Sequence, residues 1–417
     1  MISRRGFVQS GIAAASSSFL IKSARASTNR ERLLDDVQRR AVRYFYYEAD
    51  PYTGLVKDRA RNSYEEDRRI VASIAATGFG LSALATGDRR GYIPRSVALE
   101  RVERTLEHLA RMETQQGFYY HFIDMRTGDR AWNCEISSVD TSWLLCGLIH
   151  ARAHFDTSKI DRLANEILDR VNWKWMLNES DTLSHGWTPE SGFLPYRWDS
   201  YSELMAMYLL ALGSKTNPIP ARSWDAWRRP TRTYAGLKWI DSDTPLFTHQ
   251  YSHAFFDFRQ RRDKYANYFQ NSRLATEAHR IHCVSLAKQF PWYSNSLWGV
   301  TASDSRIGYS PWGGFDSRPA YDGTVVPCAA AGSLPFLPEP CMTVLETTFD
   351  KFGSRVWGRY GFSDAFHPHA NWTSPDVIGI DLGISLLMAE NYRTGSVWDA
   401  MMSTDEAKRG MQAASLA

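Results

Sequence analysis

Apolar and amphipathic segments alternate along most of the chain. Residues 137–154 and 201–212 are apolar on nearly every side, which predicts helices buried inside the protein. Residues 30–47, 96–112 and 159–171 instead carry charged residues opposite an apolar side, which is typical of helices that cover a core and face water. The alternation therefore predicts two kinds of helix, one buried and one half exposed.

Further helices are expected, and strand signals are weak. Residues 70–85 are rich in alanine and glycine, which suits a helix packed closely on all sides. The later helical candidates are 255–265, 272–289, 342–351 and 381–392, and short β-hairpins are expected in loops at 117–123 and 323–326. An all-α fold explains this pattern, namely an (α/α)6 barrel with an inner ring of buried helices and an outer ring half exposed to solvent.

Three of the apolar segments begin with an acidic residue: Asp140, Glu203 and Asp381. Each has a structural explanation as a cap or first-turn dipole partner, and Ser200 with Glu203 has the form of a capping box. In a barrel with parallel inner helices, however, these starts meet at one rim. Glycoside hydrolysis needs such a cluster, because one acid protonates the leaving oxygen while another acts on the water. Since a helix N-terminus lowers a carboxyl pKa, burial or a neighbouring acid must raise that of the proton donor.

Tryptophan is frequent in the segments expected to be loops. The chain has 15 tryptophans and 13% aromatic residues, more than a compact core needs. Trp198, Trp292 and Trp312 lie beside Gly, Pro, Asp or Asn, where a flat ring can stack on a sugar or pack a loop onto the barrel. The composition agrees with a carbohydrate site and leaves both explanations open.

The N-terminus has the features of an export signal. Residues 3–9 have the form of a twin-arginine motif, a short apolar run follows, and Ala24-Arg25-Ala26 supplies a cleavage site. We expect residues 1–26 to be a twin-arginine signal peptide and residues 27–417 to be a single barrel domain in the periplasm or outside the cell. The signal holds four basic residues and no acid, so without it 45 Lys and Arg face 46 Asp and Glu, and the formal charge moves from +3 to −1. A nucleic-acid partner therefore has no electrostatic support, and no later segment is expected to cross a membrane.

The five cysteines show no spacing typical of zinc or redox sites. We expect them to be buried or free, and Cys328 with Cys341 is the one pairing worth testing as a disulfide.

Seven motifs follow one another along the chain: EISSVDT (135–141), YSE (201–203), FTHQYSHA (247–254), GVTASD (299–304), DGT (322–324), GSLPF (332–336) and ENYRTG (390–395). Together they resemble a known family, the glycoamylase-like bacterial enzymes. That family includes the β-1,2-glucanases, of the type of glycoside hydrolase family 144, and the related domain of cyclic β-1,2-glucan synthases. The resemblance covers nearly all of the chain after residue 26.

The resemblance implies an inverting hydrolase with no required metal or other cofactor. It implies that Glu203 is the general acid, that Asp381 is the base-side carboxylate, and that Asp140 and Glu135 lie near the cleaved bond. The other residues expected to bind the oligo- or polysaccharide are Trp198, Tyr201, His249, Gln250, His253, Trp292, Asp304 and Trp312. One departure is that Asp381-Leu382-Gly383 stands where Asp-Gln-Gly is expected, so Asp364 and Asp376 remain alternative bases.

Other functions are weighed against this one. His249 and His253, with His367 and His369, could bind a metal, but they lack a carboxylate motif of known spacing. A polysaccharide lyase could use Tyr251 as its base, although the acidic motifs disfavour the uronic-acid substrates it would need. A non-catalytic glucan-binding envelope protein and a transglycosylase on the same barrel also remain open. The oligomeric state, the linkage and chain length of the glucan, and endo or exo action are left undecided.

Overall fold

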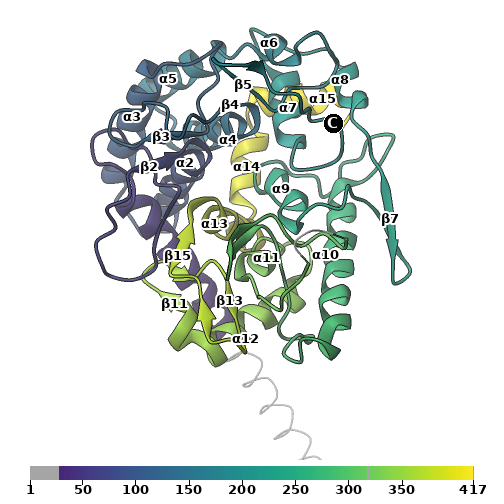
Figure 1. The fold of residues 1–417 in the computed structure, drawn as a ribbon. Coiled ribbons are helices and arrows are strands. Elements are labelled where there is room, and N and C mark those ends of the chain that lie inside the picture. The colour runs from purple at the N-terminus through teal and green to yellow at the C-terminus, as the bar shows by residue number, and fades with distance from the viewer. Residues whose placement is uncertain (1–27, 317–319, 417) are drawn as a thin grey trace, which may run out of the picture.

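The structure is a computed structural model that describes residues 28–316 and 320–416. The expected signal peptide lies outside the described residues. The chain forms an α/α barrel in which two rings of helices surround a common axis (Figure 1). The all-α prediction is therefore confirmed.

Within the described residues, six helices form the inner ring. Almost every residue of these helices is buried, and each helix packs on its neighbours around the ring. They are α2 (Ile74–Arg89), α4 (Ser138–Phe155), α7 (Met205–Gly213), α9 (Tyr251–Phe255), α11 (Pro327–Ala331) and α13 (Gly379–Arg393).

The outer helices bury one side and expose the other. In α5, for example, Ile160, Leu163 and Ile167 are buried at helical spacing while charged residues lie outside. The outer helices are 28–47, α3 (Arg95–Arg111), α5 (Ser158–Asp169), α10 (Tyr268–Ser285) and α12 (Pro338–Val356). Shorter helices complete the chain: α6 (Trp173–Leu177), α8 (Arg222–Ala226), α14 (Ser396–Met402), α15 (Asp405–Ala413), η1 (Leu246–His249) and η2 (Leu286–Lys288).

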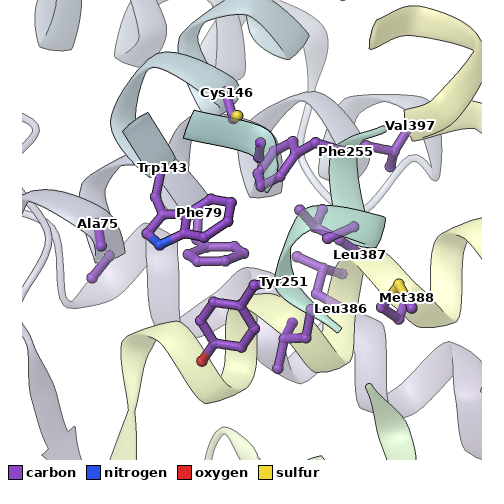
Figure 2. Packing of buried hydrophobic residues seen from close by; sticks show 14 of the residues in the cluster. Ala75, Phe79, Trp143, Cys146, Tyr251, Phe255, Leu386, Leu387, Met388 and Val397 are labelled. Atoms are coloured by element: carbon purple, nitrogen blue, oxygen red, sulfur yellow. The ribbon is translucent and has the colours of Figure 1, made fainter. Parts of the chain in front are cut away.

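The core lies inside the inner ring. Figure 2 shows Phe79 of α2, Trp143 of α4 and Phe255 of α9 packed together, with Tyr251 beside them and its hydroxyl turned away from the apolar cluster. Helices α2 and α4 approach so closely that a Cβ atom added at Gly147 would lie 1.8 Å from the carbonyl oxygen of Gly78. The small residues of the predicted helix 70–85 therefore permit this contact.

The strands are short and lie in the loops between helices. All the paired strands are antiparallel, and the longest register is that of β7 with β8, in which Thr231 faces Ile240. The pairs are β1 (Arg59–Arg61) with β15 (Asp376–Ile378), β2 (Val71–Ser73) with β3 (Phe122–Asp124), β4 (Ile136–Ser137) with β5 (Gly186–Thr188), β5 with β6 (Gly192–Phe193), β7 (Thr231–Tyr234) with β8 (Leu237–Ile240), β9 (Ser303–Ser305) with β10 (Gly308–Ser310), β11 (Trp357–Gly358) with β12 (Gly361–Phe362), and β13 (Phe366–His367) with β14 (Trp372–Thr373).

One of the expected helices was wrong. The helix predicted at 255–265 is absent among the described residues, because α9 ends at Phe255 and a turn-rich loop follows. The expectation that the cysteines are buried or free is confirmed, since all five are free thiols and Cys328 and Cys341 form no disulfide. No helix in the described ranges is long and apolar enough to cross a membrane.

Candidate active site

The three acids singled out from the sequence lie at the starts of three inner helices. Asp140 is in the first turn of α4, where the Ser137 hydroxyl caps the helix by accepting from the Asp140 backbone N–H at 3.3 Å. Asp381 is in the first turn of α13, and Glu203 precedes the first residue of α7 by two positions. The capping box proposed for Ser200 and Glu203 was wrong, because α7 begins later and the Ser200 hydroxyl bonds that of Ser242 at 2.9 Å.

Glu203 is a partly exposed carboxyl group among buried neighbours. Burial raises its pKa to about 7, and the nearby charge of Asp140 adds to the shift. The Ser252 hydroxyl donates to the Glu203 carbonyl oxygen at 2.7 Å and accepts from the Ala206 backbone N–H at 3.0 Å. A carboxyl group with a raised pKa and a fixed backbone therefore stands at the start of α7.

Asp381 is buried deeper and has several hydrogen-bond donors. The Tyr251 hydroxyl donates to its Oδ1 at 3.3 Å, and the Cys328 thiol and the Asp364 carboxyl are also close enough to donate. Burial raises the pKa of Asp381 to about 6, although these three hydrogen bonds act in the opposite direction. At neutral pH this group is a carboxylate.

The short helix α9 connects these two acids. Its adjacent residues Tyr251 and Ser252 contact Asp381 and the Glu203 backbone, respectively. Because α9 is buried on all sides, it holds the starts of α7 and α13 in a fixed relation.

A histidine that the sequence analysis missed lies between two of the acids. His121 Nδ1 is 2.9 Å from Glu135 Oε1, and His121 Nε2 is 3.6 Å from Asp140 Oδ2. Burial alone would lower the pKa of His121, but the two carboxylates raise it to about 9, and its hydrogen bond in turn lowers the pKa of Glu135. His121 is therefore an imidazolium at neutral pH. The one signal in the sequence is its place in an aromatic segment expected to be a strand.

Within the described ranges, the group whose ligand atoms could hold a metal ion consists of His121, Glu135 and Asp140. These atoms lie within 4.8 Å of one another. In the structure the protonated histidine already supplies a positive charge between the two acids. The expectation that no metal is needed stays a prediction.

Asp304 lies on the Asp381 side of the site and is almost fully paired. Its carboxylate accepts from Arg59 Nη1 and from the Ser374 hydroxyl, both at 2.8 Å. Arg59 also lies beneath the ring of Tyr309 on β10, 6.0 Å from its centre. Arg59 and Tyr309 were not foreseen, because isolated charged and aromatic residues in loops carry no periodic signal.

The two alternative bases differ in their surroundings. Asp376 is held by Arg69, whose Nη1 and Nη2 donate to its two oxygens at 2.6 and 2.8 Å, so it has no free role as a base. Asp364 is buried beside Asp381, and its Oδ2 accepts from the Asp304 backbone N–H at 2.6 Å.

Four residues expected to bind sugar have side chains in the interior, which differs from the expectation of direct contact. Tyr201, Gln250 and His253 have no exposed surface, and His249 is 2% exposed. Their side chains bond other protein groups: Tyr201 with His249 at 3.0 Å, Gln250 with Ala329 and Ser333, and His253 with Ser272 at 3.0 Å. These separate partners also argue against a shared metal at His249 and His253.

The three tryptophans also serve in packing. Trp198 stacks on His185 and donates to the Ser138 hydroxyl at 3.0 Å, Trp312 is 2% exposed and donates to Ser303, and Trp292 is half-buried against His369. Other aromatic rings face the solvent instead. Trp132 is 69% exposed and packs on Phe122, which stacks on His121. Tyr309 is 51% exposed beside Arg59.

An α/α barrel with carboxyl groups gathered where its inner helices begin is an architecture of glycoside hydrolases. Residues 195–405 match the family model named Glycoamylase, described as "Putative glucoamylase". The chain belongs to this family.

The most informative relatives are β-1,2-glucan enzymes. An exo β-1,2-glucooligosaccharide sophorohydrolase of Parabacteroides distasonis is 29% identical over 92% of this chain, and the chain spans 57% of that protein. An endo-β-1,2-glucanase of Chitinophaga pinensis, solved with sophorotriose and glucose, is 27% identical with a TM-score of 0.85 over 92% of this chain and 98% of the other. An endo-β-1,2-glucanase of Talaromyces funiculosus solved with sophorose, at 12% identity, has a TM-score of 0.67 over 92% and 90% of the two chains and shows the shared fold alone.

Proposed function

We propose that this protein hydrolyses β-1,2-glucan with inversion at the anomeric carbon. The observation that carries the proposal is the placement of two carboxyl groups, Glu203 and Asp381, at the starts of α7 and α13, where the buried helix α9 contacts both residues. Glu203 keeps its proton up to a pKa of about 7, whereas Asp381 ionises at a pKa of about 6. An inverting glycosidase needs one carboxyl group in each state.

The roles of the two residues follow from these states. Glu203 gives its proton to the glycosidic oxygen as the bond to the anomeric carbon breaks. Asp381 accepts a proton from the attacking water, directly or through a hydroxyl group of the substrate. The imidazolium of His121 holds Glu135 and Asp140 beside the acid, so the site has acceptors for sugar hydroxyls without excess negative charge.

The substrate and the location are part of the same proposal. The β-1,2-glucan substrate is supported by the two named relatives, each of which matches 92% of this chain. The twin-arginine motif supports export of the folded protein to the periplasm or beyond. Neutral Tyr251 disfavours a lyase, because burial raises its pKa well above the ordinary value and its hydroxyl donates to Asp381.

Incubation with linear β-1,2-glucan tests the proposal. We expect β-1,2-linked oligosaccharides whose new reducing ends are first seen as the α-anomer by NMR. Glu203→Gln should lower kcat by at least about 100-fold, since general acid catalysis contributes that much. Glu103→Gln is the matched control and should retain full activity, because Glu103 is a half-buried acid on the outer helix α3 that pairs with Lys159 of α5.

Three outcomes would contradict the proposal. β-Anomeric products would exclude inversion, and unsaturated products that absorb ultraviolet light would indicate a lyase. Full activity of the folded Glu203→Gln variant would show that Glu203 is not the general acid. Longer products in the presence of added sophorose would instead indicate transglycosylation.

A further inference from the structure

A second buried carboxyl group, that of Asp364, lies against Asp381. Asp364 is in the loop between β12 and β13, its exposed fraction is 5%, and its Oδ2 accepts from the Asp304 backbone N–H at 2.6 Å. Within the described ranges, Oδ1 of Asp364 and Oδ2 of Asp381 are buried oxygens with no other hydrogen-bond partner. The two carboxyl groups are within hydrogen-bond reach of each other, so both oxygens are satisfied if one of the groups carries a proton and donates it to the other.

The surroundings offer no cation that could neutralise both groups. Arg59 is bound to Asp304 and Arg69 to Asp376, and neither is paired with Asp364 or Asp381 in the described structure. The other titratable groups around the pair are neutral or acidic: Tyr251 of α9, Cys328 of α11, Tyr309 of β10, Asp304 of β9 and Tyr360 of the β11–β12 turn. The first helix and α13 contribute the apolar side chains of Val37, Ala41 and Leu382. Two ionised carboxylates in such a place would repel each other at high cost.

We infer that Asp364 holds a proton and donates it in a hydrogen bond to Oδ2 of Asp381, so that Asp364 positions the base-side carboxylate and is not itself the base. This inference rests on the proposed function, because it assigns Asp381 the role of base. Burial and the charge of Asp381 hold the pKa of Asp364 well above its ordinary value, in agreement with a proton on Asp364.

The arrangement leaves one position on Asp381 for catalysis. A carboxylate has about four lone-pair positions. Tyr251, Cys328 and Asp364 can occupy three of them, and the fourth is left for the proton of the water or of a sugar hydroxyl. Asp364 is itself fixed, because its backbone N–H donates to the Asp376 carbonyl at 3.0 Å and its Oδ2 bonds Asp304.

The loop that carries Asp364 also borders a small cavity next to the pair. Its volume is about 30 Å³, and Cys328, Ser363, Ser385 and both acids are among its lining residues. A cavity of this size admits a water molecule. In a variant that loses the Asp364 donor, a water molecule in this cavity can therefore donate to Asp381. The expected result is a graded loss of function rather than unfolding.

Three variants at two positions separate the roles, with wild-type activity on β-1,2-glucan established first. Asp364→Asn keeps a donor toward Asp381 and an acceptor for Asp304, so its kcat should stay within about tenfold of wild type. Its acidic limit, the pH below which kcat falls, should stay near that of wild type. Asp364→Leu keeps the branched shape in a larger side chain and loses the donor, so kcat should fall further and the acidic limit should move to higher pH. Asp381→Asn should lose at least about 100-fold in kcat.

Two results would overturn the inference. If Asp364→Asn is as inactive as Asp381→Asn, Asp364 is a base in its own right. If both Asp364 variants move the acidic limit to lower pH, Asp364 is ionised in the wild type and only repels Asp381. Asp50→Asn, which keeps its turn-forming acceptor far from the site, is the matched control and should behave as wild type.

A spectroscopic measurement keeps the test independent of the substrate. The infrared difference spectrum between wild type and Asp364→Asn at pH 8 should contain the carbonyl band of a protonated carboxyl group. Absence of this band would refute the inference even if the glucan were the wrong substrate. Presence of the band in a protein inactive on β-1,2-glucan would leave the protonated pair standing and reject only the proposed function.

Discussion

At the scale of single residues, environment raises the pKa of two chemically similar carboxyl groups to different extents. Burial and the negative charge of Asp140 raise the pKa of Glu203 to about 7. Asp381 is buried at least as deeply but receives hydrogen bonds that stabilise its charge. The difference lies in the number of donors, not in the depth of burial.

With the roles proposed for Glu203 and Asp381, this difference predicts a bell-shaped dependence of kcat/KM on pH. Asp381 must be ionised to accept a proton, so activity should fall below a pKa of about 6. Glu203 must be protonated to donate one, so activity should fall above a pKa of about 7. Rates on sophoro-oligosaccharides between pH 4 and pH 9 test this, with the melting temperature followed in parallel. A profile that is flat from pH 5 to pH 9 would contradict the assignment of both groups.

At the scale of secondary-structure elements, α9 has more influence on the site than its five residues suggest. It brings Tyr251 to Asp381 and Ser252 to the backbone at Glu203. The Ser252 hydroxyl satisfies a carbonyl and an N–H group where α7 has no side-chain cap of its own. The position of Glu203, the proposed general acid, therefore depends on a neighbouring helix.

Replacement of Ser252 by alanine should weaken catalysis more than stability. We expect a loss of about 1–2 kcal/mol in the free energy of unfolding, because two backbone groups lose a partner. The kcat should fall by about tenfold or more, since small shifts of a catalytic group are costly. Ser142→Ala is the matched control, because Ser142 is equally buried but bonds only within α4, to Val139. Equal kcat values for the two variants would show that Ser252 does not position Glu203.

At the scale of the whole molecule, the barrel is held together without covalent cross-links. All five cysteines are free, and four of them are buried in the core. The close approach of α2 and α4 and the aromatic packing inside the inner ring supply the contacts instead. Burial of this apolar surface is the main source of stability in such a fold.

Thiol titration checks this account. The native protein should react with a thiol reagent at one site at most, Cys134, which is half-buried and bonded to the Phe122 carbonyl. The unfolded protein should show five reactive thiols, and a reductant should leave the melting temperature unchanged. A count of three after unfolding without reductant would mean that a disulfide had formed, and Cys328 with Cys341 would then need to be reconsidered.

Much of the barrel could be predicted from hydrophobic spacing. The expected helices 30–47, 96–112 and 137–154 lie within about one or two residues of those observed. Helices α9 and α11 were missed, because five residues are too few to show a helical repeat. The capping box predicted at Ser200 was wrong because the Ser200 hydroxyl bonds Ser242, which lies in a loop 42 residues away and could not be predicted from the local sequence.

The sequence by itself determined that the protein is a barrel of helices with acids where the inner helices begin, because spacing and caps are local properties. Tertiary structure alone decided which groups work together. Tyr251 and Asp381 are 130 residues apart, and Asp304 and Asp364 are 60 apart, yet each pair is in hydrogen-bond contact. Burial and charge at a site depend on everything packed around it. For this reason the protonation of Glu203, the imidazolium of His121 and the interior position of His253 required the folded chain.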